Sequence, residues 1–235
     1  MTYTEIMKRL EELGTEQTKK TLMRHGAVEP LFGVKVGDMK KLVKFVKKDQ
    51  ELALALYDSG NYDAMYLAGL SVNPKLMTKE ILQEWAKKAS WHAPAEYTVS
   101  GVAAESEYAL ELAREWIKSD EEIIAVCGWS TYANYLSITA DENLDLNEIG
   151  ELLKQVETTI HEERNRVRYV MNGFVISVGT YVQDLSEEAK KVAVHIGKVH
   201  VDVGNTACKV PLATEYIKKI EDKERVGIKR KTCIC

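Results

Sequence analysis

The sequence has little of three things that mark special classes of protein: cysteine, long apolar runs, and an excess of positive charge. Its four cysteines, Cys127, Cys208, Cys233 and Cys235, are too few and too scattered for a disulfide framework, so we expect free thiols in a reducing compartment. No apolar run approaches the roughly 20 residues that cross a bilayer, and the first residues lack the basic-then-apolar pattern of a secretory signal. These absences predict a cytoplasmic protein that does not enter a membrane.

A formal net charge of −4 argues against a uniformly basic protein that binds polyanions without selectivity. The basic residues are nevertheless clustered, and the clusters are candidate DNA-binding sites. These candidates are Lys35, Lys40, Arg164, Arg166, Arg168, Lys209, Lys229, Arg230 and Lys231. Runs of this kind are more often the solvated faces of helices. The alternative is a local basic groove that binds phosphates.

Apolar residues recur three and four apart along almost the whole chain, and no segment has a convincing strand pattern. The pattern predicts an all-α protein. The expected helices lie near 3–13, 15–26, 37–48, 49–58, 61–72, 75–88, 91–104, 106–118, 120–138, 146–160, 163–182, 185–198 and 208–222.

Many short helices joined by short loops favour antiparallel pairs stacked in sequence, an α-solenoid of the HEAT-like or armadillo type. The repeats are not visibly similar in sequence, so a compact helical bundle is the alternative. We expect a single domain over 1–235, in which the tail over 223–235 is the part that can be extended. A solenoid has a concave face that suits a long ligand.

One helix start, over 90–97, places Trp91, His92 and Glu96 within about two turns. An aromatic face, a titratable ring and a carboxylate together make this the candidate catalytic cluster. Simpler explanations exist for each member. A Trp at a helix start usually packs in the core, and a His four residues before a Glu has the spacing of a surface ion pair.

A Phe-Gly-Val turn at 32–34 is followed by a short polar loop and a basic amphipathic helix, within 30–42. Three further segments follow in order: Tyr-Asp-Ala-Met-Tyr-Leu-Ala at 62–68, Ser-Trp at 90–91, and Arg-Tyr-Val-Met-Asn-Gly-Phe-Val at 168–175. In this order they resemble the AlkD-type DNA alkylation repair family of HEAT-like proteins. The resemblance implies a DNA glycosylase that releases cationic N3- or N7-alkylated purines from duplex DNA.

The family's site, as the resemblance implies, is a Trp and an Asp four residues apart, a later Trp, and an Arg. Those positions fall on His92, Glu96 and Phe174, while the Arg position falls within 124–127, which holds no Arg. A cationic purine leaves without a general acid, so an anion and aromatic faces beside the sugar suffice. We therefore expect Glu96 to stabilise the sugar cation, with Trp91, His92 and Phe174 as an aromatic wall. A protonated His92 would repel the lesion.

Three further residues are candidates for lining the cleft: Trp129, Tyr132 and Asn172. The two rings are also ordinary core residues, and Asn172, inside a helix, either faces a polar groove or bonds a neighbouring backbone. Arg166 and Arg168 are candidate substitutes for the missing Arg. The alternatives to a glycosylase are a non-catalytic DNA-binding relative and a solenoid that binds a protein partner.

We expect no cofactor. His195, His200, Asp202 and Cys208 carry side chains that bind metals, but their spacing matches no ordinary zinc pattern. The sequence therefore gives no reason to expect a metal.

Overall fold

The computed structural model describes residues 1–234, and within these the regular secondary structure is all helical, with no strand. The all-α prediction is confirmed. The α-helices are α1 Tyr3–Leu13, α2 Glu16–Arg24, α3 Val36–Val46, α4 Gln50–Asp58, α5 Tyr62–Ser71, α6 Lys79–Lys88, α7 Ser100–Ala104, α8 Ala109–Ile117, α9 Glu122–Ile138, α10 Leu146–Thr159, α11 Asn165–Tyr181, α12 Ser186–Ile196 and α13 Ala213–Glu221. A π-helical segment, η2 Pro94–Val99, precedes α7, and short 3₁₀ turns are η1 Pro74–Leu76, η3 Asp141–Asn143 and η4 Gln183–Leu185.

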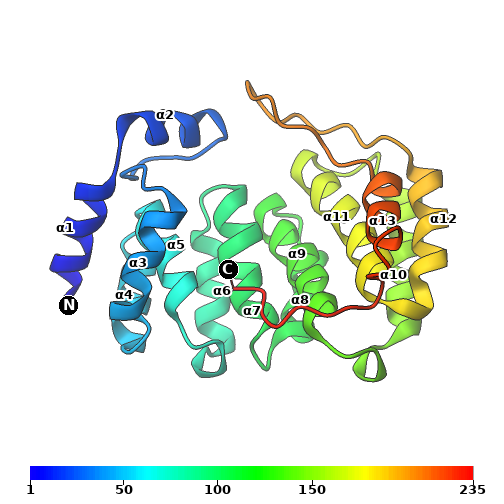
Figure 1. Ribbon diagram of the computed structural model, residues 1–235, viewed down its shortest axis with the longest axis horizontal. Helices are drawn as coiled ribbons and strands as arrows, with labels where there is room; N and C mark the ends of the chain where they lie inside the picture. Colours follow the sequence, from blue (N-terminus) through cyan, green and yellow to red (C-terminus); the bar gives the residue numbers. More distant parts are fainter. Residues whose placement is uncertain (235) are drawn as a thin grey trace.

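The helices form a stack of antiparallel pairs that runs across the molecule from α1 to α12 (Figure 1). Each pair gives one helix to an inner row, which consists of α5, η2 with α7, α9, α11 and α13. Neighbours in this row touch one another directly: α5 contacts η2, α9 contacts α7 and α11, and α11 contacts α13. The partners α4, α6, α8, α10 and α12 make the outer row. This is the solenoid that the sequence predicts.

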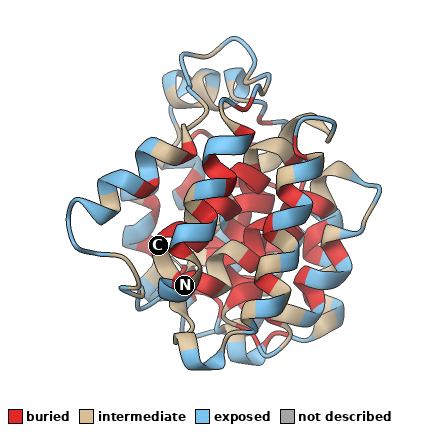
Figure 2. Ribbon diagram, turned by 90° about the vertical axis from the view of Figure 1, so that its right-hand side faces the viewer, coloured by how far each residue is buried: buried red, intermediate tan, exposed pale blue. Residues whose placement is uncertain are grey.

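The core lies between the two rows, where the buried faces of the helices meet (Figure 2). It is one continuous apolar cluster that extends from Ile6 to Ile217. Close approach of α8 and α9 depends on Gly128, because a Cβ atom there would lie 2.5 Å from the backbone nitrogen of Ile117. Such contacts hold the inner helices, which carry the candidate site, in fixed positions.

Three expected helices differ in detail from the structure. The one expected over 75–88 is interrupted, because the Thr78 hydroxyl accepts from the Ile81 backbone N–H and starts α6 at Lys79. The one expected over 91–104 is π-helical over Pro94–Val99. The one expected over 208–222 begins only at Ala213, after Pro211.

The segment over 197–212, here called the bridging loop, leaves the end of α12 and extends toward α2 (Figure 1). At its far end the Cys208 thiol lies 3.8 Å from Nδ1 of His25, which follows α2. Through this non-covalent contact, the bridging loop, which follows α12, reaches the segment that follows α2 near the other end of the stack.

The segment over 222–234, here called the C-terminal tail, returns along the C-terminal ends of the inner helices (Figure 1). Its backbone N–H groups donate to Thr180 at the end of α11, to Ser137 at the end of α9, and to the Glu105 carboxylate after α7. The tail is thus extended and satisfies backbone and side-chain acceptors of the helix ends. Cys235 lies outside the described residues.

Candidate functional site

A buried carboxylate holds the Phe-Gly-Val turn against α5. Asp63, near the start of α5, is fully buried and accepts the backbone N–H groups of Phe32, Gly33 and Val34 at 2.6, 3.0 and 2.8 Å. Gly33 has φ +80°, and a Cβ there would lie 2.5 Å from the backbone nitrogen of Lys19. Asp63 and the Phe-Gly-Val turn, separate in the sequence, therefore form one structural unit beside α5.

Glu96 and Arg166 form an ion pair between η2 and the start of α11. The Glu96 side chain is 5% exposed, and its carboxylate accepts from Nε of Arg166 and, at 2.8 Å, from Nη2. The guanidinium carbon lies 3.8 Å from the centre of the Tyr169 ring. Burial raises the pKa of Glu96, while the two hydrogen bonds from Arg166 favour the ionised carboxylate. The charge of Glu96 is compensated inside the protein.

His92 is a neutral ring at physiological pH. Burial, together with the charges of Arg166 and His25, lowers its pKa to about 4. It does not pair with Glu96, whose partner is Arg166, so the expected surface ion pair between them is absent. Because the ring is uncharged, the predicted repulsion of a cation by His92 does not arise.

Trp91 is 6% exposed and packs against two rings, with its centre 5.1 Å from that of Tyr62 and 4.8 Å from that of His92. It belongs to a small apolar cluster with Ala27, Leu31 and Tyr62, separate from the main core. The indole thus connects the helix start to the loop after α2. Its packing role is the one expected of a Trp at this position.

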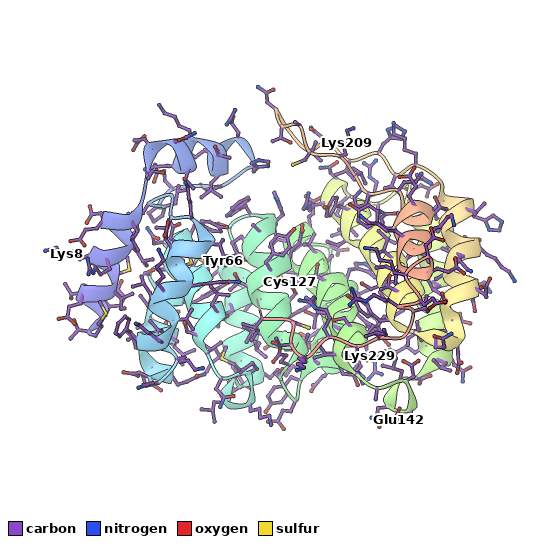
Figure 3. The ribbon with its side chains drawn as sticks, viewed as in Figure 1. Lys8, Tyr66, Cys127, Glu142, Lys209 and Lys229 are labelled. Carbon is purple, nitrogen blue, oxygen red and sulfur yellow. The ribbon has the colours of Figure 1, made fainter. Side chains whose placement is uncertain are left out.

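Trp91, His92 and Arg166 line a cavity of about 640 Å³, here called the aromatic pocket. Rings from α5, the 91–97 helix start and α11 line it, together with the end of α2, the first residues of α9 and the bridging loop. The rings are those of His25, Tyr62, Tyr66, Trp91, His92, Tyr97 and Tyr169. Figure 3 labels Tyr66, on α5, and Lys209, on the bridging loop. The amino ends of η2, α9 and α11 therefore surround one open space.

Comparison with known proteins identifies the family to which this chain belongs. The sequence matches the family described as DNA alkylation repair enzyme over residues 6–217. The chain belongs to this family. An uncharacterised protein of Listeria monocytogenes serovar 1/2a is 36% identical over 231 residues, covering 96% of this chain and all of that protein. One from Listeria innocua serovar 6a is 35% identical over 229 residues, covering 95% and 99%.

A solved structure matches the whole fold of this member of the DNA alkylation repair family. The TM-score is 0.92, the sequence identity is 37%, and the match covers all of both chains. That protein is described as one of a new family of proteins related to the HEAT-like repeat DNA glycosylases, with affinity for branched DNA structures. The predicted HEAT-like architecture and the predicted family are both confirmed.

Phe174, which aligns with the later Trp of the family, is not part of the site. It is fully buried, and its ring packs edge-on against Trp129 and Tyr132, with centres 5.2 and 5.6 Å apart. Trp129 and Tyr132 are each 1% exposed, and the Tyr132 hydroxyl donates to Glu148. The prediction of Phe174 as an aromatic wall, and of Trp129 and Tyr132 as cleft lining, is wrong because all three are core residues.

Asn172 is also buried, and its Nδ2 donates to the carbonyl of Pro211 at 2.9 Å. Of the two explanations that the sequence offered, the bond to a neighbouring backbone is confirmed. It holds the end of the bridging loop against α11, and Asn172 does not line a cleft.

The three arginines predicted to bind phosphates serve the protein itself. Arg164 donates from Nη1 to the Ser119 carbonyl, and Arg168 donates from Nη1 to the His200 carbonyl in the bridging loop. Arg166 pairs with Glu96. Their guanidinium groups connect helices and loops, and the phosphate role of Arg164 and Arg168 stays a prediction. Arg166 does provide an Arg beside the carboxylate.

Lys229 in the C-terminal tail is likewise structural. Its Nζ donates to the carbonyls of Leu136 and Tyr181 at 3.0 and 2.6 Å, and lies 2.7 Å from the Asp141 carboxylate. The two carbonyls end α9 and α11, where a cation is favoured by the helix dipole. The predicted phosphate contact at Lys229 is wrong.

The remaining predicted cations are exposed: Lys35, Lys40, Lys209, Arg230 and Lys231. Lys35 precedes Val36, and Lys209 follows Cys208, and both of these neighbours line the aromatic pocket. Arg24, which also lines the pocket, was missed, although it ends the basic helix α2. Arg24 thus lines the pocket, and Lys35 and Lys209 are the sequence neighbours of lining residues from two other segments.

Among the described residues, no group of three or more His, Cys, Asp or Glu side chains is arranged to hold a metal ion. Within the same residues, no helix combines the length and apolar character needed to cross a bilayer. The described cysteines, Cys127, Cys208 and Cys233, form no disulfide.

Proposed function

We propose that this protein binds branched DNA and leaves N-glycosidic bonds intact. The observation that carries the second part of the proposal is the pairing of Glu96 with Arg166. Stabilising an oxocarbenium ion needs an anion that is aimed at the sugar as positive charge develops there. Here the carboxylate is buried and both of its oxygens are bound by Arg166, so a sugar cation would have to compete with the guanidinium for them.

The support for DNA binding is independent of that pair. The chain is 37% identical, over its full length, to a protein with affinity for branched DNA structures. The exposed residue Arg24 lines the pocket, and the exposed residues Lys35 and Lys209 each neighbour a lining residue in the sequence. Phosphate contacts from such cations supply a large share of the affinity for DNA. A branch point presents several backbones at once, which suits cations that converge from different directions.

The test compares a four-way junction and a three-way junction with a linear duplex of equal length, by titration at several salt concentrations. We expect tighter binding of the junctions by about tenfold or more, equal to about 1.4 kcal/mol, and a steep salt dependence for all three. Equal affinity for duplex and junctions would contradict the proposal.

Hydrolysis of cationic N3- or N7-alkylated purines is the second candidate function, because the family is one of DNA alkylation repair enzymes and a carboxylate is present at Glu96. The measurement is release of 7-methylguanine from methylated duplex DNA at high protein concentration. We expect none. Release by the wild type that is abolished in Glu96→Gln would establish the glycosylase instead. The protein-partner scaffold stays a prediction that no observation here favours.

A further inference from the structure

The aromatic pocket is lined by many rings, whereas contacts with a DNA backbone are made by cations and hydrogen-bond donors. Seven rings line it, and one of them, Tyr97, is 58% exposed. Trp91 and Tyr62 pack on each other behind it, with centres 5.1 Å apart. The exposed apolar side chains of Met23 and Val36 add to the opposite edge. Large exposed aromatic and apolar surfaces of this kind mark a binding site.

The floor of the pocket carries no uncompensated charge from its two central groups. Arg166 is bound to Glu96, and its guanidinium carbon lies 3.8 Å from the centre of the Tyr169 ring. His92, whose pKa burial lowers to about 4, is neutral. The two acidic side chains at the edge are Glu122, which accepts the Arg166 backbone N–H at 2.6 Å, and Asp202, which accepts that of Gly204. The interior therefore suits a flat, neutral, hydrogen-bonding ring.

Exposed positive charges, which can bind the phosphates of a nucleotide backbone, lie near the pocket-lining residues. Arg24 from α2, Lys35 before α3 and Lys209 on the bridging loop are exposed beside pocket-lining residues. A pocket with stacking rings inside and cations at its edges is the arrangement by which proteins hold an unstacked base and its flanking phosphates. The cavity of about 640 Å³ lies within the usual size range of ligand sites.

We infer that the aromatic pocket binds one unpaired nucleobase at a DNA branch point, stacked on Tyr97, with Arg24, Lys35 and Lys209 on the neighbouring phosphates. This inference rests on the proposed function and names the part of branched DNA that the protein recognises. Base stacking on an aromatic side chain typically contributes about a 5- to 150-fold gain in affinity per base.

The experiment uses the full-length protein and two three-way junctions of identical sequence. One carries a single unpaired adenine at the branch point, and the other an abasic site in its place. We expect the wild type to bind the adenine junction at least about fivefold more tightly than the abasic one. Tyr97→Ala should bind both with the affinity that the wild type has for the abasic junction, and Tyr97→Phe should retain the preference.

The matched control is Tyr216→Ala. Tyr216 is 50% exposed, close to Tyr97 in exposure, but it lies on α13 and does not line the aromatic pocket. It should keep the wild-type preference. Junction binding that is indifferent to the missing base in the wild type would overturn the inference and leave the proposed function standing. An equal loss for both junctions in Tyr97→Ala would also overturn it. Failure to prefer any junction over duplex would overturn the proposed function itself.

Discussion

At their carboxyl ends α7, α9 and α11 are covered by the chain's own C-terminal tail, whereas at their amino ends η2, α9 and α11 surround an open pocket. Both ends carry basic residues that look alike in the sequence. Lys229 at the covered end donates to two helix carbonyls, while Lys209 at the open end is exposed. A lysine's role here depends on whether unpaired carbonyls lie within its reach.

At the open end Arg166 is bound within the protein, by Glu96, just as Lys229 is bound within the protein at the covered end. We expect Arg166→Met to lower the free energy of unfolding by about 3–5 kcal/mol, because it leaves a buried carboxylate without its partner. Urea denaturation measures this. The double variant Glu96→Gln/Arg166→Met should recover part of the loss, since no buried charge then remains.

The control for this pair is Arg9→Met. Arg9 pairs with Glu12 on the surface of α1, and both side chains are largely exposed. Its removal should change stability by less than about 0.5 kcal/mol. If Arg166→Met is as mild as Arg9→Met, the pair at the floor of the pocket is not a buried charge pair, and the main objection to hydrolysis by Glu96 is lost.

At the covered end, Lys229→Met should lower the free energy of unfolding by about 2 kcal/mol. The variant keeps the aliphatic chain but leaves the last carbonyls of α9 and α11, and the Asp141 carboxylate, without a donor. Thermal or urea unfolding measures the change. Lys231→Met, an exposed neighbour in the same tail, is the control and should stay within about 0.5 kcal/mol of wild type.

His92 provides a pH test of the open end. Its pKa is about 4 in the folded protein and close to 6.5 when unfolded, so the unfolded state takes up a proton first as the pH falls. The contribution of His92 is therefore fully present above pH 6.5 and lost as the pH falls toward 4. We expect this loss to be roughly 2 kcal/mol after allowance for the partial exposure of the ring.

Comparison of His92→Gln with wild type isolates this contribution, since other groups titrate in both proteins. The stability difference between pH 7 and pH 4 should be smaller in His92→Gln. If the two proteins lose stability in parallel, His92 is not held neutral by its surroundings, and the pocket interior is more polar than its lining implies.

The sequence predicted the helical solenoid and the family, because apolar periodicity and the order of local segments are properties of short stretches. It also put Glu96 in the candidate catalytic cluster, and that role stays a prediction. It named Arg166 as a substitute for the missing Arg but could not predict that Arg166, 70 residues after Glu96, binds both carboxylate oxygens, since this contact depends on how η2 and α11 pack. Phe174 and Lys229 were misjudged for the same reason: the sequence identifies an aromatic or basic side chain but not whether another helix or a carbonyl already occupies its surroundings.

The smallest expected effect is on DNA binding, and it should differ between variants of Lys209 and Lys229. Lys209→Ala should weaken binding of a three-way junction a few-fold and lower the slope of log affinity against log salt concentration by about 1, because one phosphate contact is removed. Lys229→Met, measured below its unfolding temperature, should leave both affinity and slope unchanged, because its ammonium is already bound to helix carbonyls and Asp141. If the two variants reduce the slope equally, the covered end also contacts DNA, and the bound strand must extend along the C-terminal tail as well as the pocket.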